Sequence, residues 1–414
     1  MKNIKIILIL SVMIFLFLLY IPAEKNDSVS KDNRVIPGVE VFLSEHLESV
    51  KGKRVGLITH PPGINSKLQS TVELFFNDPA INLVALYGPE HGMKGNGQAG
   101  EHVSFYISDK YDLPVYSLYG QTMRPKPDML KNIDVMVLDL QDIGTRIYTY
   151  ITTMAYSMQV CADMGIEFIV LDRPNPVSGN VMEGPVLNYP EFSSSVGVYP
   201  IPVRHGMTIG ELAILFNEEF FKKKVRLTVI QMKNWERNMY FDNTQLPWIF
   251  PSPNIPSLDT TIVYPGQVFI EGTNISEGRG TTRPFEIIGA PWIDGYDLAV
   301  ELNNLKLPGL IFRETSFKPT FSKYKSEKCS GVQLHIINRE KYRPFDSTLH
   351  IISKIESMYP EKFKFHSKFF DKIMGTSTVR KQLIKKISVD RIISSFNKDL
   401  KDFFIKRKKY LLYQ

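Results

Sequence analysis

The chain has 414 residues, of which 43% are hydrophobic and 12% are aromatic. This length suits about two or three domains, and this composition excludes a generally disordered protein. With only two cysteines, Cys161 and Cys329, the chain is not a disulfide-rich scaffold. The net charge of +7 is concentrated in residues 361–414, which carry 15 Lys and Arg against 5 Asp and Glu. This basic segment suits an anionic envelope surface or a solvated helical face, and without a nucleic-acid-binding motif it does not predict a nucleic acid partner.

The first 23 residues have the pattern of an export segment. Lys2 and Lys5 precede an apolar run over residues 6–21, which ends at Pro22-Ala23 and is followed by a polar spacer over residues 24–35. The run is long for a cleaved signal and slightly short for a full membrane span, so residues 1–23 are predicted to be a signal peptide or an N-terminal membrane anchor. In both cases we expect an extracytoplasmic protein, secreted or anchored to the outer face of the cytoplasmic membrane.

Apolar runs alternate with helical patterns over residues 36–234. The runs expected to be strands cover residues 54–60, 81–87, 115–119, 135–140, 168–172 and 225–230. Helical patterns cover residues 70–76, 148–165 and 208–221, and the last opens with the capping-box pattern Thr208-Ile209-Gly210-Glu211. Most of the runs are apolar throughout, which is typical of strands covered on both faces. The pattern therefore predicts an α/β domain with a doubly wound parallel sheet.

The pattern changes after this region. Trp248, Pro251, Pro253 and Pro256 disfavour helix and strand interiors, so residues 235–261 are expected to be a Pro-rich connecting or cleft-lining segment. Strand patterns at 268–271 and 332–337 then mix with helical patterns at 296–305, 349–358 and 389–404. Residues 262–414 are therefore predicted to form a smaller α+β auxiliary domain.

Polar residues follow several of the predicted strands. Because the carboxyl ends of parallel strands meet at one edge of a sheet, these residues are expected to gather where open α/β sheets bind their ligands. Such a set suits a polyhydroxylated or anionic ligand, although each aspartate alone is also consistent with helix capping. The residues are Glu90 and His91 after the second strand, Asp139, Gln141, Asp142 and Arg146 after the fourth, Asp172, Arg173 and Asn175 after the fifth, and Glu183, Arg204 and His205 in later loops.

A second polar stretch covers residues 269–285. It contains Glu271, Asn274, Arg279 and Arg283, and two fixed guanidinium groups can grip a carboxylate or a phosphate. The stretch lacks the Gly-Lys-Ser/Thr of a phosphate loop, and the Gly-x-Gly-x-x-Gly pattern at residues 95–100 does not open a helix as a dinucleotide motif would. No nucleotide cofactor is therefore expected.

Carboxylate chemistry is the most plausible basis for catalysis once metal and serine chemistry are excluded. The eight histidines show no metal-ligand spacing and no Gly-x-Ser-x-Gly elbow occurs, so neither a metal nor a serine nucleophile is expected. Glycosidases use a protonated carboxyl group to assist the leaving oxygen, and desolvation in an enclosed loop favours that form. Glu90 is the first candidate for this general acid/base. His91 could orient the site or carry a proton, and it is equally consistent with a hydrogen-bonded loop histidine.

Long motifs in one order carry a family resemblance. They include Leu-Tyr-Gly-Pro-Glu-His-Gly at 86–92, Asp-Leu-Gln-Asp-Ile-Gly-Thr-Arg at 139–146, Tyr-Thr-Tyr at 148–150, Leu-Asp-Arg-Pro-Asn-Pro at 171–176, Glu-Gly-Pro at 183–185, Arg-His-Gly-Met-Thr-Ile-Gly-Glu-Leu at 204–212, Pro-Ser-Pro-Asn at 251–254, Glu-Gly-Thr-Asn at 271–274 and Arg-Gly-Thr-Thr-Arg-Pro-Phe at 279–285. From about residue 36 to the C-terminus, the chain resembles the NamZ-like exo-β-N-acetylmuramidase family, bacterial proteins formerly described as a domain of unknown function.

The resemblance implies a Rossmann-like domain without a dinucleotide, an auxiliary domain, and a cleft that removes terminal non-reducing β-linked N-acetylmuramic acid from peptidoglycan fragments. The expected ligands are muropeptides and the N-acetylmuramic acid–N-acetylglucosamine disaccharide. The family's catalytic glutamate falls on Glu90, with His91 beside it. The substrate-binding candidates are Asp142, Arg146, Tyr148, Asp172, Asn175, Glu183, Arg204, His205, Glu271, Asn274, Arg279 and Arg283. Two alternatives stay open: a non-enzymatic muropeptide-binding protein of the envelope, and a hydrolase for another amino sugar glycoside.

Overall fold

The computed structural model describes residues 33–98, 100–101, 104–120 and 122–414, and Val35–Gln414 form one compact unit. The predicted signal or anchor over residues 1–23 lies outside the described residues, as does most of the predicted spacer. Among the helices that the structure describes, none combines the length and the apolar character needed to cross a membrane.

A seven-stranded sheet occupies the first half of the described chain, in the order β3-β4-β2-β1-β5-β6-β7. Neighbouring strands are parallel except β3 and β4, which are antiparallel. The predicted parallel sheet is therefore confirmed, and only the short edge strand β3 was not predicted. The strands are β1 (Arg54–Thr59), β2 (Asn82–Gly88), β3 (Tyr106–Ile107), β4 (Pro114–Ser117), β5 (Val135–Asp139), β6 (Glu167–Leu171) and β7 (Leu227–Ile230).

Helices cover both faces of this sheet. Alternate side chains of β5 enter two different cores: Val135 and Val137 pack in the core that contains residues of α2 (Gly38–Glu45) and α3 (Thr71–Asn77). Met136 and Leu138 pack in the core that contains residues of α5 (Tyr150–Met164) and α6 (Ile209–Glu219). The sheet is therefore doubly wound, as its uniformly apolar strands predicted. The short helix α4 (Pro127–Leu130) precedes β5.

The predicted capping box of α6 is present. The Thr208 hydroxyl accepts a hydrogen bond from the backbone N–H of Glu211 at 3.2 Å, and the Glu211 carboxylate accepts one from the backbone N–H of Thr208 at 3.0 Å. These bonds satisfy two backbone donors, one at the N-cap and one in the first turn.

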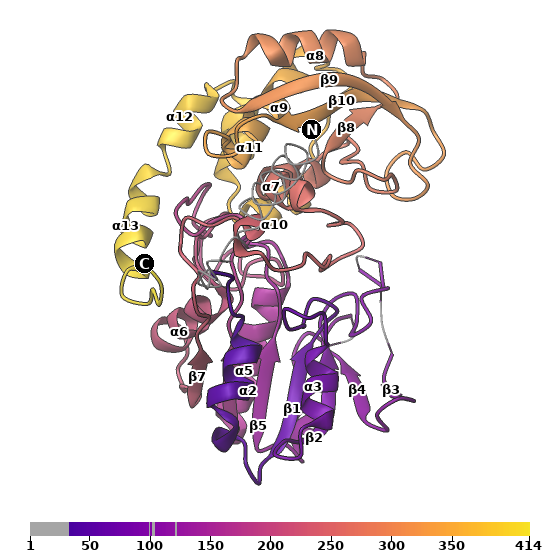
Figure 1. The fold of residues 1–414 in the computed structure, drawn as a ribbon. Coiled ribbons are helices and arrows are strands. Elements are labelled where there is room, and N and C mark those ends of the chain that lie inside the picture. Colours follow the sequence, from indigo (N-terminus) through magenta and orange to yellow (C-terminus); the bar gives the residue numbers. More distant parts are fainter. Residues whose placement is uncertain (1–32, 99, 102–103, 121) are drawn as a thin grey trace, which may run out of the picture. The chain divides into compact units, whose positions relative to one another are not determined.

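The second half of the described chain contains an antiparallel sheet of order β8-β10-β9, along which α8 lies (Figure 1). This arrangement confirms the predicted smaller α+β part. Its strands are β8 (Ile287–Ala290), β9 (Leu310–Phe317) and β10 (Cys329–Ile336), and its helices are α7 (Leu258–Gln267), α8 (Gly295–Asn304), α9 (Pro344–Met358), α10 (Ser367–Met374), α11 (Thr378–Ile384), α12 (Val389–Ser394) and α13 (Asn397–Arg407). Short 3-10 helices lie at η1 (Leu47–Ser49), η2 (Phe241–Thr244) and η3 (Val268–Gly272).

Two predictions for this half were wrong. The strand expected at 268–271 is the 3-10 helix η3, which continues directly from α7. Its apolar residues Val268, Phe269 and Ile270 are all fully buried, and a short buried run does not distinguish a helical turn from a strand. The single helix expected at 389–404 is divided into α12 and α13.

The strand order places a topological switch at the middle of the large sheet. After β1 the chain builds β2, β4 and β3 on one side, and it then builds β5, β6 and β7 on the other. Loops at the carboxyl ends of the strands beside such a switch diverge and leave a crevice. The loop after β2 carries Glu90, and the segment between β5 and α5 carries Tyr148 and Thr149.

Candidate active site

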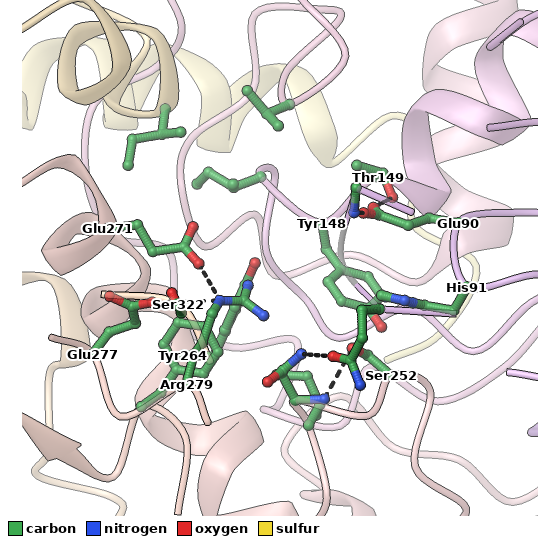
Figure 2. Close-up of a pocket in the computed structure, with 18 of the residues that line it drawn as sticks. Glu90, His91, Tyr148, Thr149, Ser252, Tyr264, Glu271, Glu277, Arg279 and Ser322 are labelled. Carbon is green, nitrogen blue, oxygen red and sulfur yellow. Dashed lines mark hydrogen bonds and ion pairs between the residues drawn. The ribbon is translucent and has the colours of Figure 1, made fainter. Parts of the chain in front are cut away.

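A cavity of about 580 Å³ lies at these loops. Its wall combines the loops after β2 and β5 with residues 252–255, η3, residues 321–323 and α10, so both halves of the described chain contribute to it. Figure 2 shows two facing groups of side chains: Glu90, His91, Tyr148 and Thr149 on one side, and Tyr264, Glu271, Glu277 and Arg279 on the other.

Glu90 presents a carboxyl group that is held by neutral donors. The turn at Gly88-Pro89 ends β2 and places Glu90 in the cavity wall, where it is 9% exposed. The Thr149 hydroxyl donates to Glu90 Oε2 at 2.7 Å, and the backbone N–H of Gly100 donates to Oε1 at 3.1 Å. No Lys or Arg of the described residues forms an ion pair with Glu90. Its carboxyl group is therefore fixed in position by uncharged donors.

His91 is fixed by its backbone and by its ring. Its φ of 73° lies in the left-handed region, and its Nδ1 lies 2.8 Å from the carbonyl oxygen of Gly97, to which the protonated nitrogen donates. Burial lowers the pKa of His91, and Arg279 lowers it further, while Glu90 and the Gly97 carbonyl oppose this shift. In the neutral imidazole that results, Nε2 is the acceptor nitrogen.

Aromatic side chains form another part of the wall. The Tyr148 ring centroid lies 6.0 Å from that of Tyr264, which in turn lies 4.8 Å from Phe285, with both ring pairs edge to face. Burial, followed by the charge of Glu90, raises the pKa of Tyr119. Such phenols remain neutral, and rigid aromatic surfaces with a polar tip suit a ligand that has both apolar and hydroxylated faces.

The opposite side of the cavity holds a compact network of charges. Arg279 Nε donates to Glu271 Oε1 at 2.6 Å and lies 3.6 Å from Glu277 Oε1, while Lys323 Nζ lies 3.0 Å from Glu277 Oε2. Burial raises the pKa of Glu271, and Arg279 counteracts this shift. The Nη1 atom of Arg279 is buried and has no hydrogen-bond partner among the described residues. Arg279 therefore retains a donor for a ligand even though its charge is balanced.

The predicted site residues fall into two sets. Glu90, His91, Tyr148, Glu271 and Arg279 line the cavity. The others lie outside the cavity lining, in contacts that join parts of the fold: Asp142, Arg146, Asp172, Asn175, Glu183, Arg204, His205, Asn274 and Arg283.

Several of the second set hold loops or helix ends. Arg146 Nη2 donates to the carbonyl oxygens of Ile373 and Met374 at 3.1 and 2.9 Å. Asn175 donates to the carbonyl oxygen of Met207 at 2.9 Å. These side chains satisfy backbone acceptors in the packed interior, which is the reason that they are polar and buried at once.

Others in this set pair with one another. Glu183 and Arg204 form a buried ion pair at 2.8 Å, and Asp142 Oδ2 lies 3.4 Å from His205 Nε2. Arg283 pairs with a residue outside this set: its Nη1 lies 2.8 Å from Glu286 Oε2.

Asp172 and Asn274 also have protein partners. Asp172 accepts hydrogen bonds from the hydroxyls of Thr208 at 2.7 Å and Tyr413 at 2.6 Å, so it ties the C-terminal segment to the end of β6. Asn274 donates to the carbonyl oxygen of Lys362 at 2.8 Å. Their position at strand or loop ends therefore serves the fold directly.

Sequence reasoning missed other residues of the cavity wall. Thr149, which holds Glu90, lies inside a quoted motif but was not singled out. Tyr119, Tyr264 and Lys372 also line the cavity, and they come from separate regions of the chain. Lys372 belongs to the basic C-terminal segment, whose charge was visible in the sequence although its place beside the cavity was not.

Comparison with known proteins covers nearly the whole chain. The family described as exo-beta-N-acetylmuramidase NamZ, N-terminal, matches residues 55–259, and the one described as exo-beta-N-acetylmuramidase NamZ, C-terminal, matches residues 262–413. The peptidoglycan beta-N-acetylmuramidase NamZ of Bacillus subtilis (strain 168) is 51% identical over 393 residues, which are 95% of this chain and 94% of that protein.

Two solved structures have the same fold. Both are DUF1343 family proteins from Bacteroides fragilis NCTC 9343. One has a TM-score of 0.86 at 38% identity, with 92% of this chain and 99% of that chain covered. The other has a TM-score of 0.75 at 31% identity, with the same coverage of 92% and 99%. The predicted α/β architecture with its smaller second part is confirmed by these similarities and by the sheets described above.

Proposed function

The chain belongs to the exo-β-N-acetylmuramidase NamZ family of glycoside hydrolases, and from this premise we propose that it removes terminal non-reducing β-linked N-acetylmuramic acid from peptidoglycan fragments. The observation that carries the proposal is the Glu90 carboxyl group, which is fixed by Thr149 and Gly100 in the wall of the cavity. Muropeptides and the N-acetylmuramic acid–N-acetylglucosamine disaccharide are the proposed substrates.

Glu90 acts as the general acid/base in this proposal. Its proton passes to the glycosidic oxygen as the bond to the anomeric carbon breaks, and the carboxylate then takes a proton from the water that completes hydrolysis. His91 keeps its ring orientation through the Gly97 carbonyl and offers Nε2 to relay that proton. The charge network around Glu271 faces this group across the cavity (Figure 2).

Two cations on the cavity wall bind the carboxylate of the lactyl group of muramic acid in this proposal. Arg279 has an unpaired Nη1 donor, and Lys372 lines the cavity with an exposed side chain. A carboxylate of the substrate can accept from both. N-acetylglucosamine lacks that carboxylate, so these cations distinguish the two sugars.

Export is part of the proposal. Lys2, Lys5 and the apolar run over residues 6–21 support a signal or an anchor that carries the enzyme to the cell wall side of the membrane. Cell fractionation tests this directly, and recovery of the full-length chain in the cytoplasm alone would contradict it.

The proposed reaction is tested with purified protein and two chromogenic substrates, the 4-nitrophenyl β-glycosides of N-acetylmuramic acid and of N-acetylglucosamine. We expect release of nitrophenol from the first and little from the second. Efficient turnover of the second would favour a hydrolase for another amino sugar. Binding of N-acetylmuramic acid without turnover of either glycoside would favour a muropeptide-binding protein.

A further inference from the structure

Tyr148 has a buried hydroxyl group that makes no hydrogen bond of normal geometry in the described part of the chain. The residue is 6% exposed and lines the cavity beside Glu90 (Figure 2). Its ring packs edge to face against Tyr150, with the centroids 4.7 Å apart. The Tyr148 hydroxyl makes no hydrogen bond of normal geometry with any described residue, and its nearest polar neighbour is the Tyr150 hydroxyl, with which it forms at most a distorted hydrogen bond.

Tyr150, two residues further along at the start of α5, provides a comparison. Its hydroxyl donates to the carbonyl oxygen of Pro251 at 2.5 Å, so it joins α5 to the Pro-rich segment around residue 251. Buried hydroxyls in folded proteins are normally hydrogen-bonded in this way, because an unpaired one loses its contacts with water and gains nothing. Phenylalanine would fill the position of Tyr148 without that loss. The oxygen of Tyr148 therefore indicates a partner that arrives with the ligand.

The chemistry of Tyr148 limits what this partner can be. Burial, and then the neighbouring Tyr150, raises the pKa of Tyr148 well above its ordinary value. The phenol therefore stays neutral and protonated, and it serves as a hydrogen-bond donor and not as a base or an anionic nucleophile. Its ligand partner is an uncharged or negatively charged acceptor near the reacting centre, because Thr149, the next residue, holds the Glu90 carboxyl group.

On the basis of the proposed function, we propose that the Tyr148 hydroxyl donates to the carbonyl oxygen of the substrate's 2-acetamido group and thereby selects N-acetylated sugars. Three acceptors surround the anomeric carbon of N-acetylmuramic acid. The glycosidic oxygen receives the proton of Glu90, and the ring oxygen becomes a poor acceptor as positive charge develops on it. The amide carbonyl is the strongest neutral acceptor that remains.

This role differs from that of the cations. The acetamido group is uncharged, so a neutral phenol matches it without the desolvation of another charge. The lactyl carboxylate is instead matched by Arg279 and Lys372 on other parts of the wall. The cavity thus recognises two substituents of muramic acid by two chemically different donors.

The experiment compares wild type, Tyr148→Phe and Tyr150→Phe on the 4-nitrophenyl β-glycosides of N-acetylmuramic acid and of muramic acid with a free amine. Thermal unfolding of each protein is measured, and binding of the two free sugars is measured by calorimetry. For Tyr148→Phe we expect kcat/KM on the N-acetylated substrate to fall by about 10- to 100-fold, with little change on the free amine. Its Tm should match or exceed that of wild type, whereas Tyr150→Phe should lower the Tm and keep the preference for the N-acetylated sugar.

Equal losses on both substrates in Tyr148→Phe, or a Tm decrease like that of Tyr150→Phe, would overturn the assignment. If wild type binds N-acetylmuramic acid but hydrolyses neither glycoside, the proposed reaction fails, and the calorimetric preference still decides the role of Tyr148. If neither free sugar binds to wild type and neither glycoside is hydrolysed, both proposals fail.

Discussion

Two groups of polar residues, most of which follow strands of the large sheet, end in different surroundings. In the buried group, polar side chains have partners inside the protein: Asp139 and Arg173 lie 2.5 Å apart with side-chain exposures of 0% and 5%, and Asp172 accepts from the Thr208 and Tyr413 hydroxyls. In the cavity group, Glu90 is held by neutral donors at the cavity wall, and the Tyr148 hydroxyl makes no hydrogen bond of normal geometry in the described part of the chain. The buried group consists of Asp139, Asp172, Arg173, Glu183 and Arg204, and the cavity group of Glu90, His91, Tyr148, Thr149 and Arg279.

The difference shows that polar residues near the same edge of the sheet serve two purposes: some stabilise the fold, and others are available to a ligand. When a buried charge has a partner of opposite charge, the folded state is more stable than it would be with that charge unpaired. The pair is then occupied within the protein and does not bind a ligand. A polar group with an unfilled donor or an unpaired carboxyl group retains that capacity. Substitutions in the two groups should therefore separate activity from stability.

The largest effect on activity is expected for Glu90→Gln. The amide keeps the size of the side chain but cannot donate an acidic proton, so kcat should fall on the order of 10²- to 10⁴-fold while the Tm changes little. The measurement is hydrolysis of the chromogenic N-acetylmuramide together with thermal unfolding. Glu101→Gln is a matched control, because Glu101 is an exposed residue of the same loop and does not line the cavity. Near-normal turnover in Glu90→Gln would remove Glu90 from the mechanism.

The largest effect on stability is expected for Arg204→Met. This change leaves Glu183 buried without its cation; the two side chains are 3% and 4% exposed in the ion pair. The free energy of unfolding should fall by about 3–5 kcal/mol, because one charge of a buried pair remains uncompensated. Turnover per folded molecule should stay close to that of wild type. Urea unfolding and active-site titration check the two parts, and a rise in KM without a loss of stability would place Arg204 in the substrate site.

The two groups should also respond to pH in opposite directions. Burial raises the pKa of Asp172 to about 7 from its ordinary 3.8. The folded protein then binds more protons at this site than the unfolded chain, so the contribution of Asp172 to stability is fully present below about pH 4 and is lost as the pH rises through 7. Burial lowers the pKa of His91 below 6.5, so its contribution is present above pH 6.5 and declines as the pH falls below that value.

Variants isolate these two contributions. Asp172→Asn should flatten the decline of the unfolding free energy between about pH 4 and 7, and His91→Gln should flatten the decline on the acidic side of pH 6.5. Each group can change the slope by at most about 1.4 kcal/mol per pH unit. Urea unfolding between pH 4 and 8 measures both slopes. A wild-type slope that neither substitution alters would show that other groups dominate the titration.

The sequence predicted the sheet better than it predicted the division between the two groups. Uniformly apolar strands identify a doubly wound sheet by themselves, as at Val135–Asp139, because covering both faces leaves no alternation. Nothing in Asp172 or Glu90 alone reveals which one lies in the packed interior and which one lines the cavity. One partner of Asp172 is Tyr413, which is 241 residues away in the chain, and such a contact depends on the complete tertiary fold.

The errors at η3 and in the C-terminal helices have a similar cause. Val268, Phe269 and Ile270 form an apolar run that suits a strand as well as a helical turn, so only its continuation from α7 decides that it is helical. Lys372 was visible as one more lysine in a basic segment. Its place on the cavity wall depends on the packing of α10 against η3, which has no local sequence signal.

The smallest effect on ligand binding is expected for a cation of the cavity wall. Here too, side chains that have an ion-pair partner can be compared with one that has none. Arg279 and Lys323 are paired with Glu271 and Glu277, whereas Lys372 has no ion pair among the described residues. Lys372→Met should therefore weaken binding of an acidic sugar by about 2- to 5-fold, the amount typical of an exposed ion pair. Added salt should reduce this difference by screening, because Lys372 is exposed.

Inhibition by N-acetylmuramic acid and by its neutral methyl ester separates the charge of Lys372 from its bulk. The substitution should raise the inhibition constant of the acid and leave that of the ester unchanged. Lys368→Met is the matched control, since Lys368 is an exposed residue of α10 that does not line the cavity. Equal inhibition constants in wild type and Lys372→Met would leave the carboxylate to Arg279 alone. A cation whose charge is already balanced would then recognise the acid through the N–H groups of its Nη1 atom, by geometry more than by net charge.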